Sequence, residues 1–75
     1  MSEQEQRLFD LAREYLNYIS LMTLPDIGEY DYQYLSSQRS IVHDELIDLT
    51  GLARPFDMIG YCQNLITGRA RPIFK

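Results

Sequence analysis

Apolar side chains recur at intervals of three and four residues along the first third of the chain, which is the spacing of one face of a helix. Ser2 and Glu5 precede this stripe with the spacing of a capping box, in which each side chain accepts a hydrogen bond from the other residue's backbone N–H. Pro25 follows the stripe and is incompatible with a continuing helix. We therefore predict a first helix over about residues 2–22. Its apolar stripe consists of Leu8, Leu11, Ala12, Tyr15, Ile19 and Met22.

Two more helical stretches follow, with a glycine between them. The first stretch predicts a helix over about residues 33–50, and Gly51 is suited to end it because glycine adopts positive φ without a steric penalty. Pro55 has the backbone angle of a first helical turn, which predicts a third helix over about residues 55–67. The fold is thus expected to be all-α, a small three-helix bundle. The apolar stripes of these two helices contain Leu35, Val42, Leu46 and Leu49, and Phe56, Ile59, Cys62, Leu65 and Ile66.

A tyrosine-rich segment lies between the first two predicted helices. Tyr30, Tyr32 and Tyr34 alternate with Asp31 and Gln33, and a period of two is typical of extended backbone. The segment is too short to form a sheet by itself. We therefore expect an extended, Tyr-rich loop that leads into the second helix.

This loop is the strongest candidate for binding another protein. Tyrosine is enriched at interfaces because its ring provides a large amphipathic surface at a low cost in conformational entropy. The carboxylates beside the rings favour a partner with a basic surface. The alternative is that two of the three rings pack onto the first and third helices. The predicted partner-binding residues are Glu29, Tyr30, Asp31, Tyr32 and Tyr34.

A chain of 75 residues buries only a small core, which we expect to provide about 3–5 kcal/mol of stability. Its single cysteine, Cys62, excludes a disulfide within the chain. We expect no metal or other cofactor, because one cysteine and one histidine offer no recognisable set of ligands. Association with a second copy remains as a means of stabilisation, so we predict a homo-oligomer. The predicted interface contains Leu16, Tyr18, Leu21, Met58 and Tyr61, which widen the apolar stripes of the first and third helices.

Charge divides the chain into an acidic and a basic part. Residues 1–50 hold ten acidic and three basic side chains, whereas residues 51–75 hold one acidic and four basic side chains. A basic tail over residues 69–75 ends what we take to be a single domain over residues 1–75. The polar, acidic start of the chain is unlike a signal peptide, and no apolar run reaches the roughly 20 residues needed to span a bilayer. We expect a cytoplasmic protein with no membrane attachment.

The region around Gly51 resembles part of a DNA-binding fold. The run ELIDLTGL over residues 45–52 resembles the E-L-x-x-L-T-G-L that precedes the recognition helix of many winged-helix regulators. The resemblance covers about residues 39–69 and implies that the third helix would read DNA. The third helix departs from that pattern because it carries Asp57 and no Lys or Arg, and the body of the chain is acidic. The residues available for DNA contact would be Arg54, Gln63, Asn64, Arg69 and Arg71.

A catalytic site would depend on His43 and Cys62. Asp44 and Glu45 follow His43 directly, but adjacent residues on a helix point about 100° apart, so these acids do not converge with the imidazole. We expect His43 to lie at the edge of the bundle. Cys62 falls on the apolar stripe of the third helix and is expected to be buried as a small hydrophobic residue.

Three functions follow from these patterns. We favour a small acidic helical module for protein–protein interaction, which regulates or inhibits a larger protein and acts as a homo-oligomer. The alternative is a helix-turn-helix regulator of transcription that binds DNA. An enzyme built around His43 and Cys62 comes third, and we do not expect the protein to be an enzyme.

Overall fold

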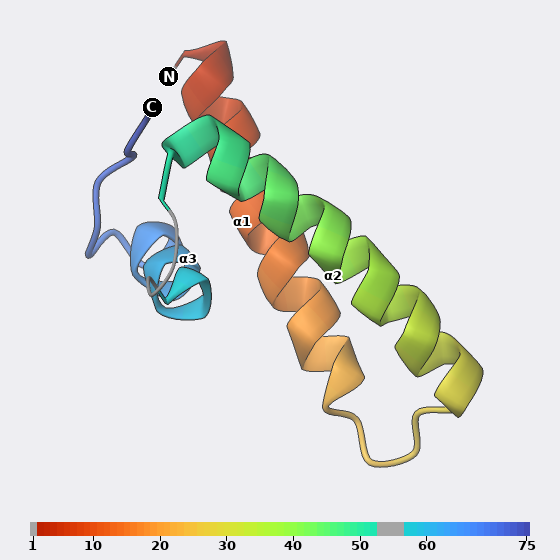
Figure 1. The fold of residues 1–75 in the computed structure, drawn as a ribbon. Helices are drawn as coiled ribbons and strands as arrows, with labels where there is room; N and C mark the ends of the chain where they lie inside the picture. The colour runs from red at the N-terminus through yellow and green to blue at the C-terminus, as the bar shows by residue number, and fades with distance from the viewer. Residues whose placement is uncertain (1, 53–56) are drawn as a thin grey trace.

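The structure, a computed structural model, describes residues 2–52 and 57–75. In this part of the chain it contains three helices, α1 (Glu3–Met22), α2 (Glu29–Thr50) and α3 (Met58–Ile66). Figure 1 shows α1 and α2 as a long antiparallel hairpin, with α3 lying to one side of it, away from the α1–α2 turn. The prediction of a three-helix bundle is confirmed.

The first helix begins as its sequence predicts. The Ser2 hydroxyl accepts a hydrogen bond from the backbone N–H of Glu5 at 3.1 Å and donates one to the Glu5 carboxylate at 3.2 Å. Thr23 caps the other end, where its hydroxyl donates to the carbonyl of Ser20 at 2.7 Å. Both ends of α1 are therefore stabilised by residues close in sequence, which is why local patterns place this helix correctly.

The second helix begins earlier than predicted, and the prediction of an extended Tyr-rich loop is wrong. Residues 29–34 form the first turns of α2, with Gly28 as an extended N-cap at φ −72° and ψ 153°. The Tyr32 N–H donates to the Gly28 carbonyl at 2.9 Å, which is the first bond of a regular helix. Glu29 and Asp31 lie in the first turn, where carboxylates interact favourably with the positive end of the helix dipole. This local stabilisation outweighs the apparent period of two.

The structure describes the third helix from its N-cap, Asp57, onward. The predicted start at Pro55 lies outside the described residues. The described helix begins at Met58, and Asp57 is its N-cap rather than a residue of its first turn. The Asp57 carboxylate accepts a hydrogen bond from the Gly60 N–H at 3.2 Å. Asp57 thus acts on the positive end of α3 as predicted, from one position earlier.

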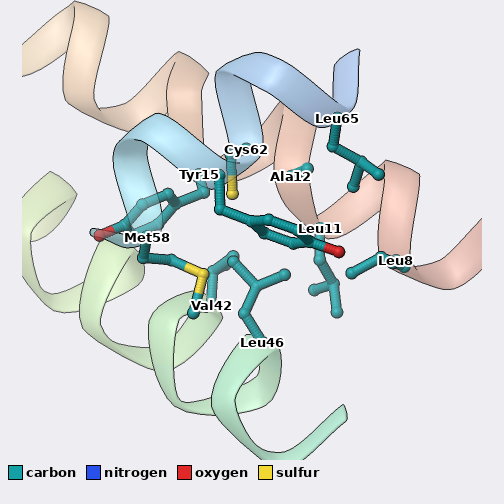
Figure 2. Packing of buried hydrophobic residues seen from close by; sticks show 10 residues of the cluster. Leu8, Leu11, Ala12, Tyr15, Val42, Leu46, Met58, Cys62 and Leu65 are labelled. Atoms are coloured by element: carbon teal, nitrogen blue, oxygen red, sulfur yellow. The ribbon is translucent and has the colours of Figure 1, made fainter. Parts of the chain in front are cut away.

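The core lies where the three helices meet, and Figure 2 shows that its side chains come from all three of them. The α1 helix packs against both α2 and α3 and supplies the central stripe. Thr50, the one buried polar residue among those described, has its hydroxyl bonded to the Leu46 carbonyl at 2.7 Å. The buried hydrophobic residues are Leu8, Leu11, Ala12, Tyr15, Val42, Leu46, Met58, Tyr61, Cys62 and Leu65.

The basic tail returns to the bundle. The Tyr61 hydroxyl donates to the Arg71 carbonyl at 3.0 Å and accepts from the Ile73 N–H at 3.0 Å. The Lys75 N–H donates to the Leu49 carbonyl at 3.1 Å, and Phe74 packs against the core. The tail therefore covers one side of α3 and reaches the last turn of α2.

Gly51 ends α2 in the left-handed region, as predicted. Its φ is 74°, and its N–H donates to the Ile47 carbonyl at 2.8 Å. Gly68 also has a positive φ, of 78°. The two glycines differ in their surroundings, because a Cβ at Gly51 would lie 3.3 Å from the Cβ of Lys75, whereas a Cβ at Gly68 would meet nothing within 4 Å.

This difference makes the two glycines a matched pair of test sites. Gly68→Ala should lower the free energy of unfolding by about 1–2 kcal/mol through the left-handed strain of an L-residue. Gly51→Ala should lower the free energy of unfolding by more than Gly68→Ala does, because the tail must also move away from the new methyl group. Urea unfolding followed by circular dichroism measures both. Equal losses would mean that the tail does not lie against Gly51.

Candidate functional site

All three tyrosines of the predicted binding segment lie at the surface. Their exposed fractions are 86% for Tyr30, 46% for Tyr32 and 60% for Tyr34. The alternative that two of these rings pack onto the other helices is therefore wrong. Tyr30 and Tyr34 are four residues apart on one face of α2, and the exposed Ile41 continues that face two turns further on.

An open apolar pocket lies beside this face, at the turn of the α1–α2 hairpin. Its volume is about 340 Å³. Tyr34 forms part of its wall, so the pocket and the exposed face of α2 are continuous. We call it the tip pocket, and its lining residues are Leu21, Leu24, Asp26, Ile27, Gly28, Asp31, Tyr34 and Leu35.

The surroundings of the tip pocket are acidic. Asp26 and Asp31 line it, and Glu29 lies between them in sequence. The chain has no Lys or Arg between Glu14 and Gln38, and the basic tail is at the opposite end of the molecule (Figure 1). An apolar ligand group with a neighbouring positive charge matches this combination of surface and charge.

The turn that carries the pocket has its own hydrogen bonds. The Leu24 N–H donates to the Leu21 carbonyl at 3.3 Å, and the Ile27 N–H donates to the Leu24 carbonyl at 3.4 Å. Gly28 then starts α2. These bonds hold the pocket walls in place before any ligand arrives, which lowers the entropy cost of binding.

The residues of the predicted oligomer interface differ in exposure. Leu16 and Tyr18 are half-buried and pack against the core, while Leu21 is 37% exposed and lines the tip pocket. Met58 and Tyr61 are buried within the single chain, so their placement on an exposed interface is wrong. Both are covered because α3 packs against α1 and also receives the returning tail, a contact that no local pattern indicates.

His43 has a partner that the sequence did not reveal. Its Nδ1 atom lies 2.9 Å from the hydroxyl of Tyr15, and the two rings are 5.5 Å apart between centroids. Burial raises the pKa of Tyr15, an effect partly opposed by a hydrogen bond from Arg39. The position of Tyr15 on the apolar stripe of the first helix was the one indication of this contact in the sequence, because a buried phenol requires a hydrogen-bond partner.

Cys62 is fully buried, as predicted. Burial raises the pKa of its thiol to about 11, so the thiol keeps its proton at neutral pH. A protonated and inaccessible thiol is a poor nucleophile. Within the described residues, no three His, Cys, Asp or Glu side chains gather in a way that could hold a metal ion.

The residues named for DNA contact are largely at the surface. Gln63, Asn64, Arg69 and Arg71 are exposed, and Arg54 lies outside the described residues. Asp57 caps the N-terminus of α3 and places a carboxylate at that end of the helix. A recognition helix approaches the bases with its N-terminal residues, where a carboxylate is repelled by phosphate.

Over the described residues, each helix is too short or too polar to cross a bilayer. We compared the chain with models of protein families, with curated proteins and with solved structures, and none of the three comparisons finds a match.

Proposed function

We propose that this chain is a cytoplasmic interaction module that binds a basic surface of a larger protein and regulates or inhibits it by covering that surface. The observation that supports this most strongly is the presence of three exposed tyrosines on the first turns of α2, one of which, Tyr34, lines an apolar pocket with carboxylates in its wall. Contiguous exposed apolar surface of this kind usually marks a binding site.

The arrangement suits the known energetics of protein interfaces. Tyrosine is among the residues that contribute most to binding when a partner covers them. Tyr30 and Tyr34 can contribute in this way together with Ile41, because the three share one exposed face of α2. The carboxylates of Asp26 and Asp31 would then act chiefly on orientation and on the rate of association with a basic partner.

A double variant tests this proposal. Tyr30→Ala with Tyr34→Ala should reduce capture of partner proteins from the host lysate at least about tenfold, since hot-spot residues contribute about 2 kcal/mol or more each. Quantitative mass spectrometry of bait-captured proteins at low and high salt provides the measurement. Captured proteins should be basic, and their recovery should fall as salt rises.

The matched control is Ile59→Ala with Ile66→Ala, which removes two exposed apolar side chains from α3. This control should leave capture unchanged. Thermal unfolding of both double variants must be similar to that of the unmodified chain, because exposed positions contribute little to stability. Equal capture by the tyrosine variant and the unmodified chain would contradict the proposal.

DNA binding is the second candidate, and the exposure of Gln63, Asn64, Arg69 and Arg71 is the observation that favours it. Fluorescence anisotropy with generic duplex DNA tests it directly. A DNA-binding protein should bind at low salt and lose affinity steeply as salt rises. We expect little binding at any salt concentration, because the described surface of α1 and α2 is predominantly acidic.

A further inference from the structure

We infer that the tip pocket of one copy receives Ile73 of a second copy, so that the chains associate head to tail. This inference rests on the proposed function, because it uses the same binding surface and names a ligand for it. The ligand is the basic segment Arg71–Lys75, which carries an exposed isoleucine between two cations.

The segment presents Ile73 outward. Its backbone is held by the bond from the Ile73 N–H to the Tyr61 hydroxyl and by the bond from the Lys75 N–H to the Leu49 carbonyl. Phe74 points the other way and packs against the core. The Ile73 side chain nevertheless remains 41% exposed. An apolar side chain fixed in this position needs little ordering before it enters a pocket.

The pocket and the segment have complementary chemistry. The pocket is about 340 Å³ in volume, open to solvent and lined mostly by apolar side chains. Asp26 and Asp31 stand in its wall, and Arg71 and Lys75 stand on either side of Ile73. Insertion of Ile73 therefore removes apolar surface from water while it brings opposite charges together.

The contact has to form between copies. Figure 1 shows the hairpin turn at one end of the molecule and the tail at the other, and the longest dimension is 37 Å. A symmetric pairing of the exposed α2 faces would bring two acidic helices together, because α2 carries five acidic side chains and one arginine, Arg39, and like charges repel. Charge therefore favours a head-to-tail contact, which is heterologous and leaves one pocket and one tail available for further copies.

Association of this kind should be weak and dependent on salt. One apolar side chain and a few exposed ion pairs supply a modest driving force. We expect the average mass of the pure full chain to rise with concentration up to about 1 mM at low salt. The same measurement in high salt should show a smaller rise, since exposed charges are then screened. Sedimentation equilibrium measures both.

Two variants locate the contact. Ile73→Asp removes the ligand side chain, and Leu24→Asp places a carboxylate in the pocket wall at a position that is 48% exposed. Each should lower the association constant more than about tenfold. The control Ile66→Asp makes the same chemical change at a similarly exposed position on α3 and should associate normally. Circular dichroism confirms that all three variants fold.

Mixing the two variants gives the decisive result. Ile73→Asp keeps an intact pocket and Leu24→Asp keeps an intact tail, so an equimolar mixture should form a one-to-one complex that does not grow further. A constant monomer mass of the unmodified chain at low salt would overturn the inference. So would equal losses from Ile66→Asp and Ile73→Asp, or a mixture that remains monomeric.

These outcomes are separate from the test of the proposed function. The measurements use pure protein, so monomeric behaviour would remove the second copy as a ligand and leave binding of another basic protein intact. Conversely, head-to-tail association without capture of any other protein would support this inference and contradict the proposed function.

Discussion

Leu46→Ala should leave a large fraction of the chain unfolded at room temperature. Leu46 is fully buried on α2, among side chains of all three helices (Figure 2). Truncating a buried leucine costs about 2–5 kcal/mol, because it loses buried apolar surface and leaves a cavity. A core of this size provides only about 3–5 kcal/mol in total. Urea unfolding followed by circular dichroism gives the free energy of unfolding.

Leu24→Ala is the matched control for this prediction. It makes the same chemical change at a leucine that is 48% exposed in the hairpin turn, where the effect on stability should be about 0.5 kcal/mol or less. The pair therefore separates burial from the change of residue type. A loss below about 1 kcal/mol for Leu46→Ala would mean that α2 is not packed as described.

The elements of the fold that the sequence predicts well depend on neighbouring residues. The Ser2 half of the predicted capping box and the positive φ of Gly51 are confirmed, and both involve interactions within a few residues. The Tyr-rich segment shows where this approach fails. Residues 30–34 fit an extended strand and a first helical turn equally well. The acidic side chains in the first turn of α2 favour the helix, because they interact with the positive end of its dipole.

The candidate site is harder to predict, because contacts between distant residues create it. The sequence predicts the tyrosines as binding candidates, but their exposure follows from the α1–α2 packing and not from their spacing. The tip pocket joins Leu21 of α1 to Leu35 of α2 through the turn. The burial of Met58 and Tyr61 likewise requires α1 and the returning tail, neither of which a pattern within α3 indicates.

The second large effect should appear on raising the pH above about 9. Burial raises the pKa of Cys62 from its ordinary value of 9.0 to about 11. It also raises the pKa values of Tyr15 and Tyr61 above 10.0. Below about pH 9 all three groups are protonated in both states, so their contribution to stability is fully present.

Between about pH 9 and pH 11 the unfolded chain releases the Cys62 proton while the folded chain retains it, so the free energy of unfolding falls. The rise in the pKa of the thiol from 9.0 to about 11 lowers the free energy of unfolding by roughly 2–3 kcal/mol at most once both states are ionised. Tyr15 and Tyr61 add to the loss above pH 10. Because the total stability is only about 3–5 kcal/mol, the chain should be largely unfolded near pH 11.

Urea unfolding at several pH values gives the slope of stability against pH, and Cys62→Ala isolates the part that belongs to the thiol. This variant should be less stable than the unmodified chain at about pH 8, since it loses buried volume, yet its stability should change less between about pH 9 and 10. Tyr15→Phe tests the steeper region above about pH 10 in the same way. If the stability of the unmodified chain and that of Cys62→Ala fell equally as the pH rose, the Cys62 thiol would not have the raised pKa that burial in this core requires.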